Sequence, residues 1–190
     1  MPDLVLASTS KYRRVLLERL GVPFRCAAPR IDENVLKGQG LDPRALAVRL
    51  ARGKAESVRG DGAVIVGSDQ VVAFDGKVFD KPGDADGAVR QLLAMSGRPH
   101  ELITAVAVVQ GERVAGHVDV TTLWMRPLTR IQVERYVQAD RPFDCAGSYK
   151  LEERGIALFE RIDSRDHSAV TGLPLIALTT LLIEFGFAIP

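Results

Sequence analysis

Apolar runs alternate with amphipathic segments in the first part of the chain. Residues 4–7 are an apolar run, hydroxyl residues follow it, and Leu16 and Leu20 then stand four residues apart among charged positions. This order predicts a strand, a turn and a helix, because apolar residues four apart lie on one face of a helix. The apolar residues at 24–27 predict a second strand, and the polar, glycine-containing stretch at 32–40 predicts an irregular loop.

A second helix is predicted to start at Asp42 and Pro43, which suit the N-cap and the first helical position. Leu50 and Val58 belong to its apolar stripe, and Lys54 falls on the same stripe. A lysine in this place either extends its ammonium past the edge of the core or binds an anion such as phosphate. The helix pattern alone does not decide between these two interpretations.

The run at 63–66 is apolar at every position, which is typical of a central strand covered on both faces. The strand is predicted to stop at residues 67–70, where polar residues replace the apolar ones. Asp69 would then stand at the carboxyl end of a central strand. Residues 71–79 predict a hairpin, because an Asp-Gly pair separates two β-like runs.

The rest of the chain continues the alternation of strands and helices. The predicted elements are a helix at 84–95 ended by Ser96-Gly97, strands at 101–109 and 113–124 joined in a hairpin, a helix opened by a Thr129–Gln132 capping box, a strand at 156–159 and a last helix opened by Pro174. Strands that alternate with helices, together with antiparallel hairpins, predict an α/β fold with a mixed sheet flanked by helices. A chain of 190 residues suits a single domain, 1–190, with room for two lobes.

Composition limits the classes of partner. Lysine and arginine total 25 and aspartate and glutamate 24, so the formal charge of +1 provides no broad attraction to nucleic acid or to an anionic membrane. No signal peptide or membrane span is expected, because the start of the chain lacks a basic region before an apolar stretch and Glu184 interrupts the apolar end. Cys26 and Cys145 have neither zinc nor disulfide spacing, and we expect buried thiols. We therefore expect a cytoplasmic protein that binds no nucleic acid and no membrane.

Cationic residues point to a phosphate ligand. Ser8 and Ser10 stand where a strand turns into a helix, so their hydroxyls and the free backbone N–H groups can face an anion. Arg13 follows within one turn and offers a fork of donors that matches phosphate oxygens, although an arginine there can also be merely solvated. Lys54 and Lys81 could reach the same polyphosphate.

Acidic residues add a candidate metal site. Asp69 at the predicted strand end, with Glu33 and Asp32 in the predicted loop, could hold a hard cation such as Mg²⁺ through carboxylate oxygens. The competing interpretation is that Asp69 caps a turn and that Glu33 is solvated. The three histidines show no short-range ligand pairing and no catalytic grouping, and His100 is expected to make a structural hydrogen bond.

The same residues occur in the motifs of one known family. Residues 6–14, Leu-Ala-Ser-Thr-Ser-Lys-Tyr-Arg-Arg, resemble the Leu-Ala-Ser-x-Ser-x-x-Arg-Arg opening of the Maf family of nucleotide pyrophosphatases, and the resemblance covers essentially the whole chain. Further matching blocks, in the same order, are Glu33, Lys54-Ala55, Gly67-Ser68-Asp69, Lys81-Pro82, Ser96-Gly97 and Gly172-Leu173-Pro174. The chain departs from the family at Lys11, where proline is common, and at 163–166, where a Gly-Asp-Tyr stretch is usual.

The resemblance implies a Maf/ITPase-like fold, in which two lobes flank a central cleft, and a homodimer. It also implies a hydrolase acting on phosphoric anhydrides, which converts a nucleoside triphosphate to the monophosphate and pyrophosphate with Mg or Mn as the divalent metal cofactor. Such a site must neutralise the phosphates and hold water in line with the leaving pyrophosphate.

Roles for single residues follow from the matched motifs. Asp69 is the implied catalytic aspartate, and it would either bind the metal with Glu33 or accept the proton from water. The residues that would bind and neutralise the triphosphate are Lys54, Lys81, Arg13, Ser8 and Ser10.

Two branches of the family differ after the central strand. One has Asp-Thr there and favours dTTP and UTP, and the other has Asp-Gln, an aromatic residue in the opening motif and a glutamate after Cys-Ala-Gly-Ser-x-Lys. This chain has Gln70, Tyr12 and Glu152 at these positions and resembles the second branch, so we expect 7-methyl-GTP as substrate. Tyr12 would stack on the cationic methylated base, Glu152 would accept hydrogen bonds from the guanine edge, and Gln70 would donate or accept one. The alternatives are a dTTP/UTP pyrophosphatase and a non-catalytic nucleotide-binding module linked to cell division.

Overall fold

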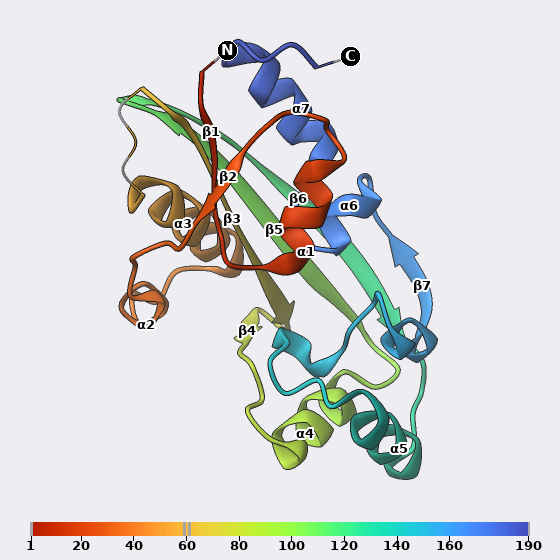
Figure 1. The fold of residues 1–190 in the computed structure, drawn as a ribbon. Coiled ribbons are helices and arrows are strands. Elements are labelled where there is room, and N and C mark those ends of the chain that lie inside the picture. The colour runs from red at the N-terminus through yellow and green to blue at the C-terminus, as the bar shows by residue number, and fades with distance from the viewer. Residues whose placement is uncertain (1, 59, 61, 190) are drawn as a thin grey trace. The chain divides into compact units, whose positions relative to one another are not determined.

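Strands and helices alternate along the chain as the hydrophobic pattern predicts (Figure 1). In the computed structural model, which describes residues 2–58, 60 and 62–189, the contacts between residues separate the chain into two units. Unit 1 holds residues 1–70, 104–119 and 166–190, and unit 2 holds residues 71–103 and 120–165. Strands β3 (Val64–Phe74), β5 (Pro99–Gln110) and β6 (Arg113–Met125) contribute residues to both units. The strands form parallel and antiparallel pairs, so the predicted mixed α/β class is confirmed.

Strand β1 (Leu4–Ala7) has a parallel neighbour on each side in unit 1. β2 (Arg25–Ala27) and β3 pair with it, and β5 and β6 continue the sheet beyond β3. Every residue of β1 is buried, as expected for a parallel strand that is covered on both faces. Leu6 pairs with Val66, so β1 ends one residue later while β3 continues. Residues 68–70 of β3 therefore lie beyond the end of β1.

Alternate residues of β1 and β3 face two different hydrophobic clusters. One cluster holds the even-numbered residues of 4–6 and 64–66 together with leucines of α1 (Lys11–Glu18) and α7 (Leu175–Glu184). The other holds the odd-numbered residues of these segments together with Ala55 of α3 (Pro43–Glu56). Helices therefore cover both faces of the sheet in unit 1.

Helix α3 touches the main chain of β3 at Gly67. A Cβ atom on Gly67 would lie 2.2 Å from the carbonyl oxygen of Ala51 and 2.6 Å from the backbone nitrogen of Ala55, which is closer than atoms can approach. Only glycine allows this approach of helix to strand. The approach brings the last turn of α3, which contains Lys54, next to the part of β3 that follows Gly67.

Two local predictions in unit 1 are wrong. The stretch at 32–40 is not an irregular loop throughout, because Asp32 accepts the N–H groups of Asn34 and Val35 and thereby caps a short helix, α2 (Glu33–Lys37). Strand β3 does not stop at residues 67–70. It runs without a break to Phe74, so Asp69 lies within the strand and not at its carboxyl end.

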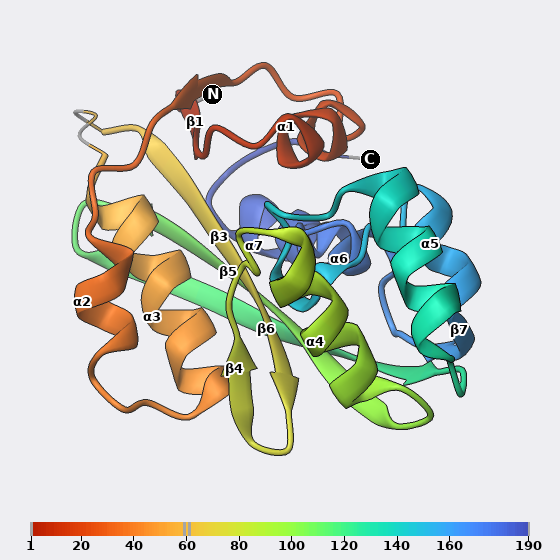
Figure 2. The same ribbon diagram turned by 90° about the horizontal axis from the view of Figure 1, so that it is seen from below.

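Unit 2 contains α4 (Ala85–Met95) and α5 (Arg130–Asp140), which lie side by side (Figure 2). The predicted hairpin joins β3 to β4 (Lys77–Phe79) and turns at Asp75 and Gly76, which both have positive φ angles. An Asp-Gly pair suits this turn because both of its central residues must adopt that conformation.

The end of unit 2 follows the sequence pattern in part. The predicted capping box between Thr129 and Gln132 opens α5. The strand predicted at 156–159 is wrong in position, because Arg154–Leu158 is a 3₁₀ helix, and strand β7 (Phe159–Asp163) begins after it and pairs antiparallel with β6.

Three further expectations concern burial and helix ends. Cys26 is exposed and Cys145 is half-buried, so the prediction of two buried thiols is wrong. Cys26 lies on β2, which has a strand on only one side and is exposed along most of its length. Pro174 is the N-cap of α7, so the prediction that it opens the last helix is confirmed. Among the residues that the structure describes, no helix has both the length and the apolar character needed to cross a bilayer.

Candidate functional site

Lys54 lies between two carboxylates in unit 1. Its Nζ atom is 2.9 Å from Oε1 of Glu33 and also contacts Oδ1 of Asp69. Lys54 and Asp69 are each 7% exposed, whereas the Glu33 side chain is 43% exposed. A charge that leaves water needs a partner of opposite sign. The interpretation in which Lys54 extends past the edge of the core is therefore wrong, because its ammonium is buried against Asp69.

Local structure explains why these three residues meet. The close approach at Gly67 sets the last turn of α3 beside β3, and Asp69 is two residues further along that strand. Glu33 is the first residue of α2, and the cap made by Asp32 fixes where this helix starts. The chain thus delivers one charge from each of α2, α3 and β3 to the same place.

The polar residues of β3 do not end the strand, because distant segments of unit 1 satisfy them. Ser68 is fully buried and donates its hydroxyl to the carbonyl oxygens of Ala105 and Gly172, at 2.8 and 3.0 Å. Successive side chains of a strand point to opposite faces, so Asp69 faces away from Ser68 and toward α3. The sequence prediction failed here because these partners lie far away in the chain.

The amide of Gln70 is held in one orientation. Its Nε2 atom lies 2.9 Å from Oγ1 of Thr104, 2.9 Å from the carbonyl oxygen of Ala169 and 3.2 Å from that of Val170. Carbonyl oxygens only accept hydrogen bonds, so the NH₂ group must face them. The amide oxygen Oε1 is then the atom that Gln70 can offer to a ligand, and it can only accept a hydrogen bond.

Arg13 of α1 lies near the same carboxylates. Its Nε atom donates to the carbonyl oxygen of Gly172 at 2.9 Å. Burial lowers the pKa of Arg13, while the charges of Asp69 and Glu33 act in the opposite direction. Its nitrogens Nη1 and Nη2 make no hydrogen bond or ion pair within residues 2–58, 60 and 62–189. We refer to Arg13, Lys54, Asp69 and Glu33 as the charged cluster.

Ser8 and Ser10 form the turn between β1 and α1. Oγ of Ser8 accepts the N–H of Ser10 at 3.1 Å, and Oγ of Ser10 accepts the N–H of Arg13 at 3.4 Å. Each hydroxyl therefore keeps its own hydrogen to donate to an anion, and the N-terminus of α1 adds the positive end of the helix dipole. The turn places these hydroxyls next to the start of the helix that carries Arg13, as the sequence predicts.

The remaining predicted site residues are Tyr12, Lys81 and Glu152. Tyr12 is half-buried on α1, and the ammonium of Lys11 lies 4.9 Å from its ring centre. Lys81 is exposed in the loop between β4 and α4, and Glu152 is exposed after the 3₁₀ turn Ala146–Ser148. Lys81 and Glu152 belong to unit 2, so their approach to the charged cluster of unit 1 stays a prediction.

Sequence reasoning missed the main-chain groups that hold the site. The carbonyl oxygens of Ala169, Val170 and Gly172 accept hydrogen bonds from Gln70, Ser68 and Arg13. A main-chain carbonyl has no residue-type signal, and only the matched block at Gly172 pointed to this segment. Thr104 was missed as well. In its case a residue-type signal exists, because Thr104 is a buried threonine within an otherwise apolar strand.

His100 has the structural role that the sequence predicts. In unit 2 its Nε2 atom is 3.0 Å from the hydroxyl of Tyr149, and its ring packs against those of Tyr149 and Phe159. Burial lowers the pKa of His100 to about 4, so the ring is neutral at pH 7. His100 is therefore part of the core of unit 2.

The charged cluster suits a metal ion that binds together with a substrate. Within the described ranges, no group of three or more His, Cys, Asp or Glu residues could hold a metal by itself. Mg²⁺, however, is commonly bound through one or two carboxylates, with waters and substrate phosphates as the other ligands. Asp69 and Glu33 provide such a pair, because both contact the Lys54 ammonium and therefore lie close to one point.

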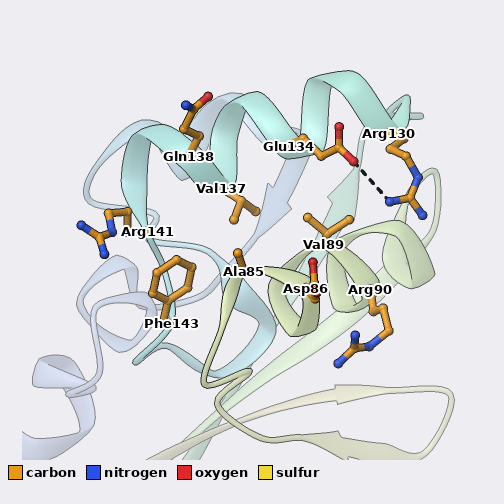
Figure 3. A pocket seen from close by; sticks show the side chains of 10 residues that line it. All are labelled: Ala85, Asp86, Val89, Arg90, Arg130, Glu134, Val137, Gln138, Arg141 and Phe143. Atoms are coloured by element: carbon orange, nitrogen blue, oxygen red, sulfur yellow. Dashed lines mark hydrogen bonds and ion pairs between the residues drawn. The ribbon is translucent and has the colours of Figure 1, made fainter.

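A separate groove of about 760 Å³ lies in unit 2 (Figure 3). Ala85 and Val89 of α4 line it together with Val137 of α5 and Phe143, and Figure 3 shows Arg141 beside the Phe143 ring. None of the predicted site residues lines this groove. It is therefore distinct from the charged cluster, which consists of residues of unit 1 only.

Comparison with known proteins agrees with this fold. A HAM1 protein from Coxiella burnetii aligns with a TM-score of 0.51 and 16% sequence identity over 97% of this chain and 100% of that chain, which shows a shared α/β fold. The family model described as Maf-like protein matches residues 3–185, so the chain belongs to the Maf family. The resemblance that the sequence motifs indicate is thereby confirmed.

Relatives of high similarity are named 7-methyl-GTP pyrophosphatase. The protein of this name from Bdellovibrio bacteriovorus is 47% identical over 180 residues, which are 95% of each chain. The one from Xanthomonas oryzae pv. oryzae is 48% identical over 192 residues and covers 100% of each chain.

Proposed function

We propose that this chain is a nucleoside triphosphate pyrophosphatase that hydrolyses 7-methyl-GTP to the monophosphate and pyrophosphate. The observation that carries the proposal is the charged cluster, in which a buried lysine and an arginine lie near two carboxylates. A polyphosphate-binding protein needs only cations, whereas hydrolysis also needs an acidic group that binds a metal or accepts a proton from water. The relatives named 7-methyl-GTP pyrophosphatase support both the reaction and the substrate.

Cations and hydroxyls would bind the triphosphate. Arg13 can present Nη1 and Nη2, because its Nε is used by Gly172. The hydroxyls of Ser8 and Ser10 would donate to phosphate oxygens at the start of α1. Lys54 and Lys81 would add two ammonium groups. Neutralisation of the phosphates reduces their repulsion of the attacking water. This repulsion is the main barrier that a pyrophosphatase must lower.

Asp69 and Glu33 would provide the acidic part of the chemistry. Lys54 contacts Oδ1 of Asp69, so Oδ2 would bind the metal or accept the proton from the attacking water. A bound Mg²⁺ or Mn²⁺ ion would polarise the phosphate oxygens and help to orient the water. Glu33 is half-exposed and would complete the carboxylate pair at this ion.

Three side chains would select the base. Gln70 can only accept a hydrogen bond through Oε1, which suits the N–H groups on the guanine edge. Tyr12 would stack on the cationic methylated ring, and Glu152 would accept further hydrogen bonds from the base. Thymine and uracil have one ring N–H and no exocyclic amine, so they offer fewer donors to these acceptors.

Hydrolysis assays with 7-methyl-GTP, GTP, dTTP and UTP test the proposal, each with Mg²⁺ or Mn²⁺ and with pyrophosphate as the measured product. We expect the highest kcat/KM for 7-methyl-GTP and no turnover after chelation of the metal. A kcat/KM for dTTP or UTP that equals or exceeds the kcat/KM for 7-methyl-GTP would contradict the proposed substrate. Release of orthophosphate instead of pyrophosphate would contradict the reaction.

Assembly and location are separate parts of the proposal. The resemblance implies a homodimer, and the cytoplasmic location is expected because no signal peptide or membrane span is predicted. Light scattering during size-exclusion chromatography would measure the mass against 20.7 kDa for one chain. Fractionation of cells would test the location, and a monomer or a membrane-bound protein would contradict these parts alone.

A further inference from the structure

Residues 166–176 contact two side chains of the proposed site. This segment, here called the 166–176 loop, includes the short helix α6 (His167–Val170), whose N-cap is Asp166, and it ends in the first residues of α7. The carbonyl oxygen of Gly172 accepts the hydrogen bond from Nε of Arg13. The carbonyl oxygens of Ala169 and Val170 accept those from the amide of Gln70. The loop therefore touches both the residue proposed to bind phosphate and a residue proposed to select the base, although it offers them only main-chain atoms.

The direction of the Gly172 carbonyl decides which nitrogens of Arg13 remain for a ligand. Gly172 has a φ angle of +114°, which side-chain-bearing residues rarely adopt, and its Cα lies against the Arg13 side chain, since a Cβ atom there would be 3.5 Å from Nε. The same carbonyl also accepts the hydroxyl of Ser68 at 3.0 Å. A rotation of this peptide group would release Nε and allow the guanidinium to turn.

Two buried side chains close the loop at both of its ends. Oδ1 of Asp166 accepts the N–H of Ser168 at 2.9 Å and its hydroxyl at 2.5 Å, and Oδ2 accepts the N–H of Ile176 at 2.8 Å. Oγ of Ser168 in turn accepts the N–H of Leu175 at 2.8 Å. Asp166 and Ser168 are 4% and 2% exposed. The start of the loop is thus tied to the start of α7.

Asp166 is present as a carboxylate despite its burial. Burial raises its pKa, but hydrogen bonds from Ser168 and from the N–H of Ile176, together with the nearby His167, lower it, and the balance lies below the ordinary value. A carboxylate accepts charge-assisted hydrogen bonds, which are stronger than those of a neutral amide. The ring of hydrogen bonds around Asp166 is therefore a firm support for the loop.

We propose that Asp166 and Ser168 are positioning residues that hold the 166–176 loop in the conformation in which Gly172 orients Arg13 toward the phosphates of a nucleotide. This inference rests on the proposed function of Arg13. Neither residue would touch the substrate, and both would act through the main chain of the loop. A merely structural pair would stabilise the fold without any link to Arg13.

A double-mutant cycle in binding separates these two roles. The variants are Asp166→Asn, Ser168→Ala and Arg13→Ala, and the probe is inorganic tripolyphosphate, whose affinity is measured by calorimetry on the full chain. We expect Asp166→Asn and Ser168→Ala each to weaken binding roughly tenfold, the order of effect of groups that hold a ligand-binding side chain in place. In the Arg13→Ala background, either change should alter the affinity less than about twofold, because the group that they position is gone.

The matched control is Asp42→Asn, since Asp42 also caps a helix of unit 1 through two backbone N–H groups but lies outside the loop. It should leave the affinity unchanged. The proposal would be overturned if Asp166→Asn and Ser168→Ala weakened tripolyphosphate binding equally in the wild-type and Arg13→Ala backgrounds. A wild-type chain that binds no tripolyphosphate would overturn it as well. Ser168→Ala decides the matter if Asp166→Asn lowers the folded fraction. Absence of nucleotide turnover alongside a coupled binding cycle would contradict the proposed enzyme but not the positioning role.

Discussion

Lys54 and Asp69, which are 15 positions apart in the chain, form a buried ion pair between helix α3 and strand β3. Their side chains are only 9% and 11% exposed. Glu33 contacts the same ammonium from a more exposed position. The pair therefore affects both the stability and the chemistry of the chain. If either partner is removed, the other remains as an unpaired buried charge.

Asp69→Asn should abolish most of the turnover and preserve the fold. The change keeps the size of the side chain but removes the charge that a metal or a proton requires, and Glu33 still pairs with Lys54. We expect kcat for 7-methyl-GTP to fall by roughly 10²- to 10⁴-fold, the range for loss of a general base. Asp163→Asn is the control, since Asp163 pairs with Arg161 at an exposed site. Turnover close to wild type would remove Asp69 from the mechanism.

Lys54→Met should lower both stability and activity. Methionine keeps much of the aliphatic packing, but Asp69 then lacks its buried partner, and we expect the free energy of unfolding to fall by about 3–5 kcal/mol. Urea unfolding measures this loss. Arg52→Met on the same helix is the control, because Arg52 pairs with Glu56 at the surface and such pairs contribute only about 0.5 kcal/mol. Similar losses for both variants would show that burial of the Lys54 pair has no special weight.

Glu152→Gln should narrow the preference for the methylated base. Glutamine keeps one acceptor oxygen but loses the charge that favours a cationic ring, so kcat/KM should fall more for 7-methyl-GTP than for GTP. The neighbouring Glu153 is also exposed and provides a matched control in Glu153→Gln. If the ratio of kcat/KM for 7-methyl-GTP to kcat/KM for GTP stays constant in Glu152→Gln, Glu152 does not select the base.

His100 should make the stability of the chain fall in mild acid. Its folded pKa of about 4 lies below the 6.5 of an unperturbed histidine, because burial favours the neutral ring. Its contribution is therefore complete above pH 6.5 and is lost as the pH falls toward 4, by about 3 kcal/mol in total. Unfolding free energies of wild type and His100→Phe between pH 7 and 4 measure it, and the variant should show the shallower decline. The exposed His117 provides the control His117→Gln, which should keep the wild-type slope.

Local patterns predicted the elements that depend on local chemistry. The apolar run at 4–7, the cap at Asp42 and the Thr129–Gln132 capping box all appear where the sequence places them. Each of these features depends on neighbours within a few residues. The short helix after Asp32 was missed because the glycines around it outweighed a cap signal.

Long-range contacts were out of reach of the sequence pattern. Ser68 and Gln70 suggested the end of a strand, yet residues near 105 and 170 satisfy them and let β3 continue. Lys54 was recognised as out of place on an apolar stripe, but its carboxylate partners could not be assigned, because α2, α3 and β3 meet only in the folded chain. The hydrogen bond from Arg13 to Gly172 was missed for the same reason.

The close contact at Gly67 limits which substitutions the chain can tolerate at this position. Any side chain at Gly67 would meet Ala51 and Ala55. Helix α3 therefore packs against β3 at a distance that leaves no room for a side chain at this position. Alanine, the smallest replacement, would already push the helix outward and carry the Lys54 ammonium away from its partner. The spacing of the charges is thus set by a residue that has no functional group.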